Sequence, residues 1–304
     1  MLITGDQLLA VANDHNFAIP AFNIAEYNMF NAIMEICEQK QAPFIAQIHP
    51  NEINLLTFDI VQAMRSRIHR SPLPVIIHWD HGASHSQIAA AIQGGFTSVM
   101  IDKSMEPFDV NVEITRRVVD TAHAVNVSVE GELGTIGSMD HATTGDGIVY
   151  TDPSDALTFV EETGVDSLAI AIGTRHGIYP AGVTPRLDLD RLRRIKEAVG
   201  IPLVLHGGSN NPDDEIAEAA RSGVNKINIS SDLKSAYHNA LRNVLRDESL
   251  YEPDAIQPPA MNALKDVVAH KLDLLGTTGK AELYRQPASR EIDLFGLVGQ
   301  TLTV

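Results

Sequence analysis

The chain has 304 residues, 44% of them hydrophobic, so it can supply one large core or two small ones. Its 39 acidic residues outnumber its 23 basic ones, and the net charge is -16. Basic residues gather only in the short stretch 191–194, which we interpret as the solvent-exposed face of a helix. We therefore expect no nucleic-acid partner and no membrane partner.

The cysteine content and the N-terminal residues indicate a cytoplasmic location. Cys37 is the only cysteine, so no intramolecular disulfide can form, as is usual in a reducing compartment. It falls on the apolar side of a predicted helix, where we expect a buried, unreactive thiol. Residues 1–16 lack the basic start of a signal peptide. No apolar run reaches the roughly 18 residues of a membrane helix.

Short apolar runs alternate with amphipathic stretches of helical length along the chain. Several runs are almost continuously apolar, as strands covered on both faces must be. The predicted strands cover 17–24, 43–49, 74–80, 97–102, 127–133, 167–173, 202–208 and 226–230. The predicted helices lie near 26–40, 52–68, 84–93, 109–125, 154–163, 188–199, 212–222 and 231–246. Asp152 and Asn211 each precede a proline that fits the first position of a helix.

Eight such units predict an α/β fold, specifically a (β/α)8 TIM barrel, with a doubly wound open sheet as the alternative. The barrel is favoured because polar residues collect at the carboxyl ends of the strands, where barrel active sites lie. These residues are Asn23, His49, Asp80, His81, Asp102, Glu132, His176, His206, Asn228 and Ser230. We expect a single barrel domain over residues 1–284. A C-terminal helical extension over 285–304 would pack on a neighbouring subunit or on its own barrel.

Three of the 12 histidines precede a glycine, and each lies at or just after the end of a predicted strand. His81, His176 and His206 would thus converge on one mouth of the barrel from the third, sixth and seventh strands. Three neutral imidazoles with an open fourth position form a catalytic zinc site. A single histidine of this kind is more often structural, but three at equivalent positions favour the metal site.

Carboxylates accompany these histidines. Asp80 directly precedes the first of them, and it can orient a metal ligand or act as general acid and base beside the metal. Glu132, at the end of the fifth predicted strand, can bind the metal or support a residue that does. His78 shares the strand face of Asp80 and either supports it or fills the barrel. Asp140 lies in the long glycine-rich stretch that follows, which is typical of a lid.

Two consecutive loops have the composition of a phosphate site. The stretches 205–212 and 226–234 each place small residues and backbone N–H groups between a strand and the start of a helix. In barrels these last two loops commonly bind phosphate. Ordinary helix capping by Ser231 or Asp232 is the alternative. The residues suited to phosphate are Gly207, Gly208, Ser209, Asn228, Ser230 and Ser231.

Five stretches together resemble a known enzyme family. The stretches "HWDHG", "VEGELGTIG", "DSLAIAIGTRHGIY", "IPLVLHGGS" and "KINISSDLK" are similar, in this order, to those of the zinc-dependent class II ketose-bisphosphate aldolases. The tagatose-bisphosphate and fructose-bisphosphate branch looks most similar. The resemblance runs from Asn23 to Lys280. It implies reversible cleavage of a phosphorylated ketose to dihydroxyacetone phosphate and an aldehyde, by a homodimer or homotetramer.

The resemblance also implies roles for individual residues. Asp80 would exchange the proton of the C4 oxygen, and Asp140 would move a proton at C3. The metal positions would be His81, His176 and His206, which bind Zn²⁺, together with Glu132 and Asp102, which match alternative or inhibitory metal positions. Contacts to the substrate, its first phosphate or a monovalent cation (Na⁺ or K⁺) would come from Asn23, Gly177, Gly207, Gly208, Ser209, Asn228, Ser230 and Ser231.

Two departures from the family pattern affect the expected substrate. Trp79 replaces the usual leucine, and Pro258 stands near the place where bisphosphate-cleaving members carry an arginine for the distal phosphate. Arg175 either compensates or selects another group. A ketose 1-phosphate or a longer sugar-acid phosphate is therefore the alternative substrate. A metal-dependent hydrolase and a non-catalytic subunit are the competing hypotheses for function, whereas Lys226 is rejected as a Schiff-base lysine because it starts the last strand.

Overall fold

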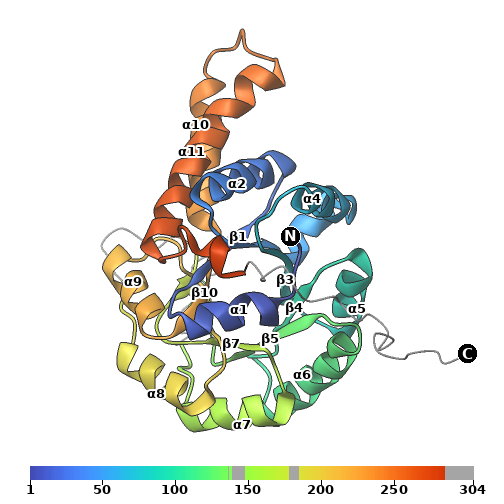
Figure 1. The fold of residues 1–304 in the computed structure, drawn as a ribbon, viewed down its shortest axis with the longest axis vertical. Helices are drawn as coiled ribbons and strands as arrows, with labels where there is room; N and C mark the ends of the chain where they lie inside the picture. The colour runs from blue at the N-terminus through green and yellow to red at the C-terminus, as the bar shows by residue number, and fades with distance from the viewer. Residues whose placement is uncertain (136, 139–147, 178–184, 285–304) are drawn as a thin grey trace, which may run out of the picture.

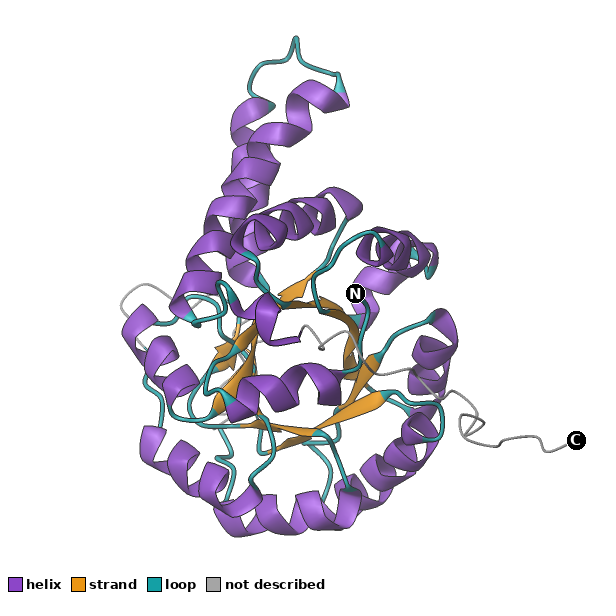
Figure 2. Ribbon diagram, viewed as in Figure 1, coloured by secondary structure: helices purple, strands orange, loops and turns teal. Residues whose placement is uncertain are grey.

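The computed structural model describes residues 1–135, 137–138, 148–177 and 185–284, and the side chains of 137, 138 and 176 are outside this description. Eight parallel strands close into a barrel in the order β1-β10-β9-β7-β5-β4-β3-β2, surrounded by helices (Figure 1, Figure 2). The strands are β1 (Ile19–Asn23), β2 (Phe44–Ile48), β3 (Val75–Gly82), β4 (Ser98–Ile101), β5 (Ser128–Leu133), β7 (Ser167–Ile170), β9 (Leu203–Leu205) and β10 (Val224–Ile229). The predicted (β/α)8 barrel is confirmed.

Short strands β6 (Gly137–Ser138) and β8 (Arg175–His176) form a separate parallel pair. The helices are α1 (Gly5–Asp14), α2 (Tyr27–Lys40), α3 (Pro50–Leu56), α4 (Asp59–His69), α5 (His85–Gly94), α6 (Phe108–His123), α7 (Pro153–Thr163), α8 (Leu189–Val199), α9 (Asp213–Arg221), α10 (Ser231–Val244) and α11 (Pro253–Leu274), followed by the 3-10 helix η1 (Lys280–Tyr284). The segment predicted as one helix over 52–68 is two helices, because Thr57 takes a left-handed φ of 57°. Pro212 is the N-cap residue directly before α9, whereas the sequence predicted it at the first position inside the helix.

Helix α1, which lies outside the predicted helix ranges, closes the amino-terminal end of the barrel. Figure 1 shows it lying across that end. Its residues Leu8, Leu9 and Ala12 pack with the barrel interior in one buried apolar cluster. Gly5 approaches β5 so closely that its N–H donates to Ser128 Oγ at 2.8 Å, and a methyl group at Gly5 would collide with that hydroxyl. This packing leaves the carboxyl end as the open mouth.

The interior changes from apolar to polar along the barrel axis. Next to α1 the strands contribute aliphatic side chains such as Ile19, Ile45 and Ile76. Further toward the carboxyl ends, alternate residues point into the barrel and are polar. The buried polar residues of this upper part are Asn23, Gln47, His78, Asp80, Glu130, Glu132, His206, Lys226 and Asn228. The charged chemistry is therefore confined to one half of the interior.

Helices α10 and α11 form a hairpin that extends well beyond the barrel (Figure 1). α11 also lies outside the predicted helix ranges and runs through Pro258 and Pro259, which usually interrupt helices. Leu245 and Tyr251 are exposed near the turn of this hairpin. Within the described residues, no helix is both long and apolar enough to cross a membrane. The predicted extension over 285–304 lies outside the described residues.

The packing of α1 predicts a measurable contribution to stability. Leu8→Ala removes a fully buried side chain from the barrel closure, so it should lower the free energy of unfolding by about 2–5 kcal/mol. Leu55→Ala is the matched control, because Leu55 is 81% exposed, and it should change stability by less than about 0.5 kcal/mol. Urea denaturation measures both. Equal effects of the two substitutions would show that α1 does not stabilise the barrel.

Candidate active site

The open mouth contains a cavity of about 510 Å³. Its described lining residues are Asn23, His49, Asn51, Glu52, Asp80, His81, Asp102, Ser104, Met105, Glu132, Gly177, Gly207, Ser209, Asn228, Ser230, Ser231 and Lys234. Most of the site residues predicted from the sequence thus lie in one place. His206 and Gly208 are the exceptions among those described: His206 is completely buried next to His81, which lines the cavity. A methyl group at Gly208 would collide with the Ile227 side chain and with the carbonyl of Asn228, so this glycine allows the loop after β9 to approach β10 closely.

The structure does not describe the side chains of two predicted site residues, Asp140 and His176. Asp140 lies outside the described residues. His176 ends the short strand β8, which pairs with β6, but its side chain is not among those described. The lid over 131–147 is likewise described only in part. The roles assigned to Asp140 and His176 therefore stay predictions.

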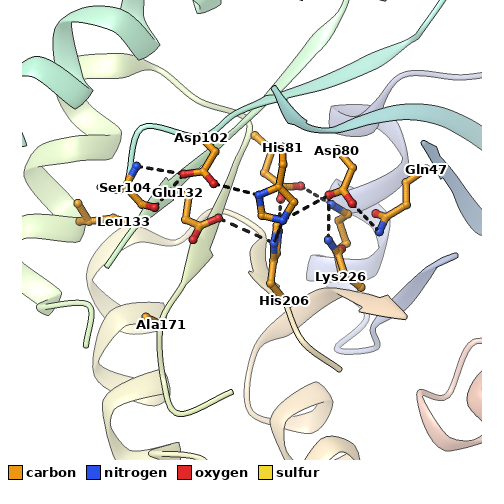
Figure 3. Close-up of polar contacts among 12 residues, drawn as sticks. Gln47, Asp80, His81, Asp102, Ser104, Glu132, Leu133, Ala171, His206 and Lys226 are labelled. Atoms are coloured by element: carbon orange, nitrogen blue, oxygen red, sulfur yellow. Dashed lines mark hydrogen bonds and ion pairs between the residues drawn. The ribbon is translucent and has the colours of Figure 1, made fainter. Parts of the chain in front are cut away.

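The described centre of the cavity is a pair of histidines from β3 and the end of β9. His81 Nε2 and His206 Nδ1 lie 3.0 Å apart, and the two rings meet edge to face (Figure 3). The left-handed φ of 49° at His81 turns the chain where β3 leaves the barrel. His206 is completely buried. Two elements far apart in the sequence thus bring two potential metal-binding nitrogens together.

Carboxylates on the far sides of the two rings determine their tautomers. His81 Nδ1 lies 3.0 Å from Asp102 Oδ2, and His206 Nε2 lies 2.8 Å from Glu130 Oε1. Burial would raise the pKa of both carboxyls, but their partners together lower it, chiefly the bond to His81 for Asp102 and the nearby Lys226 ammonium for Glu130. The ionised carboxylates accept, so these ring nitrogens donate. The facing nitrogens, His81 Nε2 and His206 Nδ1, then share one position for a positive charge, which is either a proton on His81 or a metal ion that both nitrogens bind.

The remaining groups around the histidines fit a metal ion. Glu132 Oε2 is buried with no hydrogen-bond partner among the described residues and lies 3.8 Å from His206 Nδ1. Burial, followed by the Asp102 charge, raises the pKa of Glu132 well above its usual value. Burial opposes charging of His81 too, but Asp80 and Asp102 raise its pKa to about 10. A positive charge is thus favoured at this centre, and imidazole and carboxylate are ligands that zinc accepts.

Asp80 is held beside the histidines by three amide side chains. Its Oδ2 accepts from Asn23 at 3.1 Å and from Gln47 at 3.3 Å, and its Oδ1 accepts from Asn228 at 3.2 Å. Burial would raise the pKa of Asp80, but the neighbouring histidines, His81 first, lower it below its usual range. Asp80 is therefore an ionised and oriented carboxylate, able to accept a proton from a bound hydroxyl group.

A buried ion pair supports this centre from below. Lys226 Nζ donates to Glu130 Oε2 at 2.6 Å and lies 3.2 Å from His78 Nε2. Burial, together with the Lys226 charge, lowers the pKa of His78 to about 3, so its ring is neutral and accepts from the lysine. His78 Nδ1 then donates to Ser98 Oγ at 2.8 Å. His78 thus fills the barrel and makes no hydrogen bond to Asp80.

Glu130 is a site residue that was not predicted from the sequence, although a signal was present. Glu130 and Glu132 lie two residues apart on one strand, so they share its inward face. Lys234 and Glu52 were not predicted either; they lie in helices α10 and α3 and meet only through the closed barrel. No local sequence pattern predicts a contact between these two residues.

The two predicted phosphate loops are joined by one hydroxyl group. Ser209 Oγ accepts from the backbone N–H groups of Ser230 and Asp232 at 3.2 and 3.3 Å. Ser209 therefore caps helix α10 from the neighbouring loop, a role that the sequence suggested for Ser231 or Asp232. Gly207 needs its left-handed φ of 66°, and a side chain there would collide with the Arg175 carbonyl. The loops are packed closely, and several of their residues line the cavity.

Comparisons with known proteins identify the family of this chain. The family model described as "Fructose-bisphosphate aldolase class-II" matches residues 3–280. A fructose-bisphosphate aldolase of Staphylococcus aureus strain N315 is 37% identical over 286 residues, covering 92% of this chain and 99% of the relative. A 6-phospho-5-dehydro-2-deoxy-D-gluconate aldolase of Bacillus licheniformis is 40% identical over 280 residues, covering 90% and 95%.

Solved structures show the same relationship. The YdjI aldolase from Escherichia coli K12 matches with a TM-score of 0.83 and 33% identity, covering 92% of this chain and 100% of that one. The family match and these relatives define the class of the protein, a carbon–carbon lyase on a barrel fold. The chain belongs to the class II fructose-bisphosphate aldolase family, and it is an aldolase.

The ion pair below the site predicts a linked effect on stability and metal binding. Glu130→Gln leaves the buried Lys226 ammonium without a carboxylate, so the free energy of unfolding should fall by about 3–5 kcal/mol. It also weakens the support of His206, so affinity for a divalent metal should fall about 10–100-fold. Calorimetric unfolding and metal titration against a chelator test these effects. Asp190→Asn, which alters the exposed pair with Arg193, should change neither quantity measurably. A variant that binds metal normally would contradict the supporting role.

Proposed function

We propose that the protein is a zinc-dependent aldolase that reversibly cleaves a phosphorylated ketose between C3 and C4. The products are dihydroxyacetone phosphate and an aldehyde. One observation carries the proposal: two imidazole nitrogens, His81 Nε2 and His206 Nδ1, face each other beside the ionised carboxylate of Asp80. That arrangement places a cation site next to a proton acceptor, which aldol cleavage requires.

His81 and His206, with His176 as the third ligand from the sequence, would hold the zinc. Glu132 and Asp102 would provide alternative metal positions. A carboxylate oxygen of each and a ring nitrogen of His81 all lie within 4.8 Å of one another. When bound, the zinc supplies a Lewis acid that disperses the negative charge left beside the ketose carbonyl. The chain's own residues then have to orient the sugar and move its protons.

Asp80 would take the proton from the C4 hydroxyl during cleavage and return it during condensation. Its three amide partners keep one carboxylate geometry, so little reorganisation is needed when the proton moves. Of these partners, Asn23 and Asn228 also line the cavity and can contact the substrate. Asp140 would exchange the proton at C3 from the stretch that follows β5.

The loops after β8, β9 and β10 would bind the phosphate of the dihydroxyacetone phosphate half. Gly177, Gly207, Ser209, Ser230 and Ser231 line the cavity there, and Gly208 shapes the loop behind them. Backbone N–H groups near the start of α10 favour an anion. A monovalent cation, Na⁺ or K⁺, would bind beside the phosphate.

The relatives, a fructose-bisphosphate aldolase and a 6-phospho-5-dehydro-2-deoxy-D-gluconate aldolase, support a phosphorylated sugar as substrate. The first candidates are fructose 1,6-bisphosphate and, from the sequence resemblance, tagatose 1,6-bisphosphate. A ketose 1-phosphate or a sugar-acid phosphate without a distal phosphate is the second candidate. It is favoured by Pro258, which lies in α11 and not among the described residues that line the cavity. We further propose a cytoplasmic homodimer or homotetramer, with residues 1–284 as one domain and 285–304 as an extension.

The proposal predicts release of dihydroxyacetone phosphate from at least one member of a ketose panel. The panel holds fructose and tagatose 1,6-bisphosphates and the corresponding 1-phosphates, each assayed with and without chelator. Chelation should abolish release, and added Zn²⁺ should restore it, because no lysine of the described cavity forms a Schiff base in this scheme. Release that survives complete metal removal would contradict the zinc mechanism. Products that have gained water would identify a hydrolase.

Asp80→Asn tests the proton acceptor. Asparagine keeps the shape but cannot accept the C4 proton, so kcat should fall by about 10²–10⁴-fold. Zinc content, measured by elemental analysis, should stay at the wild-type value because Asp80 is not among the proposed ligands. Asp59→Asn, a change of the same type in an exposed helix start, should leave kcat unchanged. Wild-type turnover in Asp80→Asn would remove this residue from the mechanism.

A further inference from the structure

One wall of the cavity has no role in the scheme above. It consists of His49, Glu52 and Lys234, and we refer to these three residues as the β2 wall. His49 follows β2 and caps helix α3, Glu52 lies in α3, and Lys234 lies in α10. The imidazole rings of His49 and His81 have centroids 5.8 Å apart. The β2 wall therefore adjoins the proposed reaction centre.

The ammonium group of this wall is already paired. Lys234 Nζ lies 2.5 Å from Glu52 Oε1, and the two side chains are 33% and 14% exposed. Glu52 Oε2 is buried, has no hydrogen-bond partner among the described residues, and lies 3.8 Å from His49 Nδ1. Lys234 is the only lysine or arginine among the described residues that line the cavity. Its charge is thus neutralised inside the cavity.

The third member of the wall is uncharged. His49 Nδ1 accepts a hydrogen bond from the backbone N–H of Asn51 at 3.1 Å, so the ring proton is on Nε2. A ring whose Nδ1 accepts a hydrogen bond carries only this one proton and is neutral. The β2 wall as a whole therefore has no net charge, yet it offers a carboxylate oxygen as an acceptor and an imidazole N–H as a donor.

The position of the wall indicates which half of a substrate it meets. In the barrel order, β10 and β1 separate β9 from β2. A ketose with its phosphate at the loops of Gly207 and Ser209 and its carbonyl near His81 and His206 would extend toward β2. The part beyond the cleaved bond, which leaves as the aldehyde, would then lie against the β2 wall.

We propose that the β2 wall recognises the aldehyde-forming half as an uncharged polyhydroxyl chain, and that Glu52 determines this specificity. Hydroxyl groups can donate to Glu52 and accept from His49, whereas a second phosphate would meet the Glu52 carboxylate and a lysine that is already neutralised. This inference rests on the proposed aldolase function and selects the ketose 1-phosphate type among its candidate substrates.

Removal of one charge tests the inference. In Glu52→Gln the Lys234 ammonium becomes available to a distal phosphate. The ratio of kcat/KM for ketose 1,6-bisphosphate to that for ketose 1-phosphate should rise about tenfold, as one charge-assisted hydrogen bond would give. Fructose and tagatose forms of both substrates are assayed with the zinc-loaded protein.

Two further variants serve as controls. In the double variant Glu52→Gln/Lys234→Gln the gain should disappear. Glu35→Gln, which breaks the 2.5 Å pair with Lys265 away from the cavity, is the matched control with an unchanged ratio.

Two results would overturn the inference. One is an unchanged ratio in Glu52→Gln. The other is a wild-type preference for the bisphosphate that Lys234→Gln removes, since Lys234 would then already bind the distal phosphate. Failure of the aldolase function has a different signature, namely no cleavage of any ketose by the wild type. In that case dissociation constants of fructose 1-phosphate and fructose 1,6-bisphosphate, measured by calorimetry for the same variants, give the ratio and decide the inference.

Discussion

The buried pair of Lys226 and Glu130 is the interaction on which the site depends. Both side chains are only 1% exposed and lie inside the barrel. Burial of an unpaired ammonium or carboxylate would cost several kcal/mol, so each residue requires the other. The pair also leaves Glu130 with one oxygen for His206 Nε2. Because Glu130 is held ionised, the tautomer of His206 is fixed, and its other nitrogen faces His81.

The two ends of the barrel interior have different roles: the end near α1 stabilises the fold, and the opposite end forms the candidate site. Around α1, the interior is filled with Leu8, Ile19, Ile45 and similar aliphatic groups that need only exclude water. At the opposite end, amides and carboxylates hold one another through specific hydrogen bonds around Asp80. Polar groups this deep are tolerated because most of them have partners, although Gln47 Oε1 and Asn228 Oδ1 have none among the described residues. Glu132 Oε2, which has none among the described residues, marks the place where a cation fits.

The proposed specificity residues and the proposed reaction centre come from different parts of the barrel. The relatives carry names of aldolases that act on different phosphorylated sugars, although they align over almost the whole chain. A shared centre with variable loops is the usual way in which one barrel accepts several substrates. In this chain, Glu52 and Lys234 come from α3 and α10, outside the strands that hold Asp80 and the histidines. A change in that wall can therefore alter specificity while the proton-transfer geometry stays the same.

The sequence by itself determined the eight strands, the closed barrel, the aldolase family and the gathering of His81, His206 and Asp80 at one mouth. The strands and the polar residues directly after them are readable because they depend on local order, whereas the family follows from the resemblance of five stretches to the class II aldolases. The closed barrel alone decided which distant residues meet. Glu130 contacts Lys226 across 96 positions, and Lys234 contacts Glu52 across 182. No periodicity encodes such pairings, because they arise only when β10 closes against β1. Helix α1 was not predicted for the same reason, because its apolar face packs only against the end of the closed barrel.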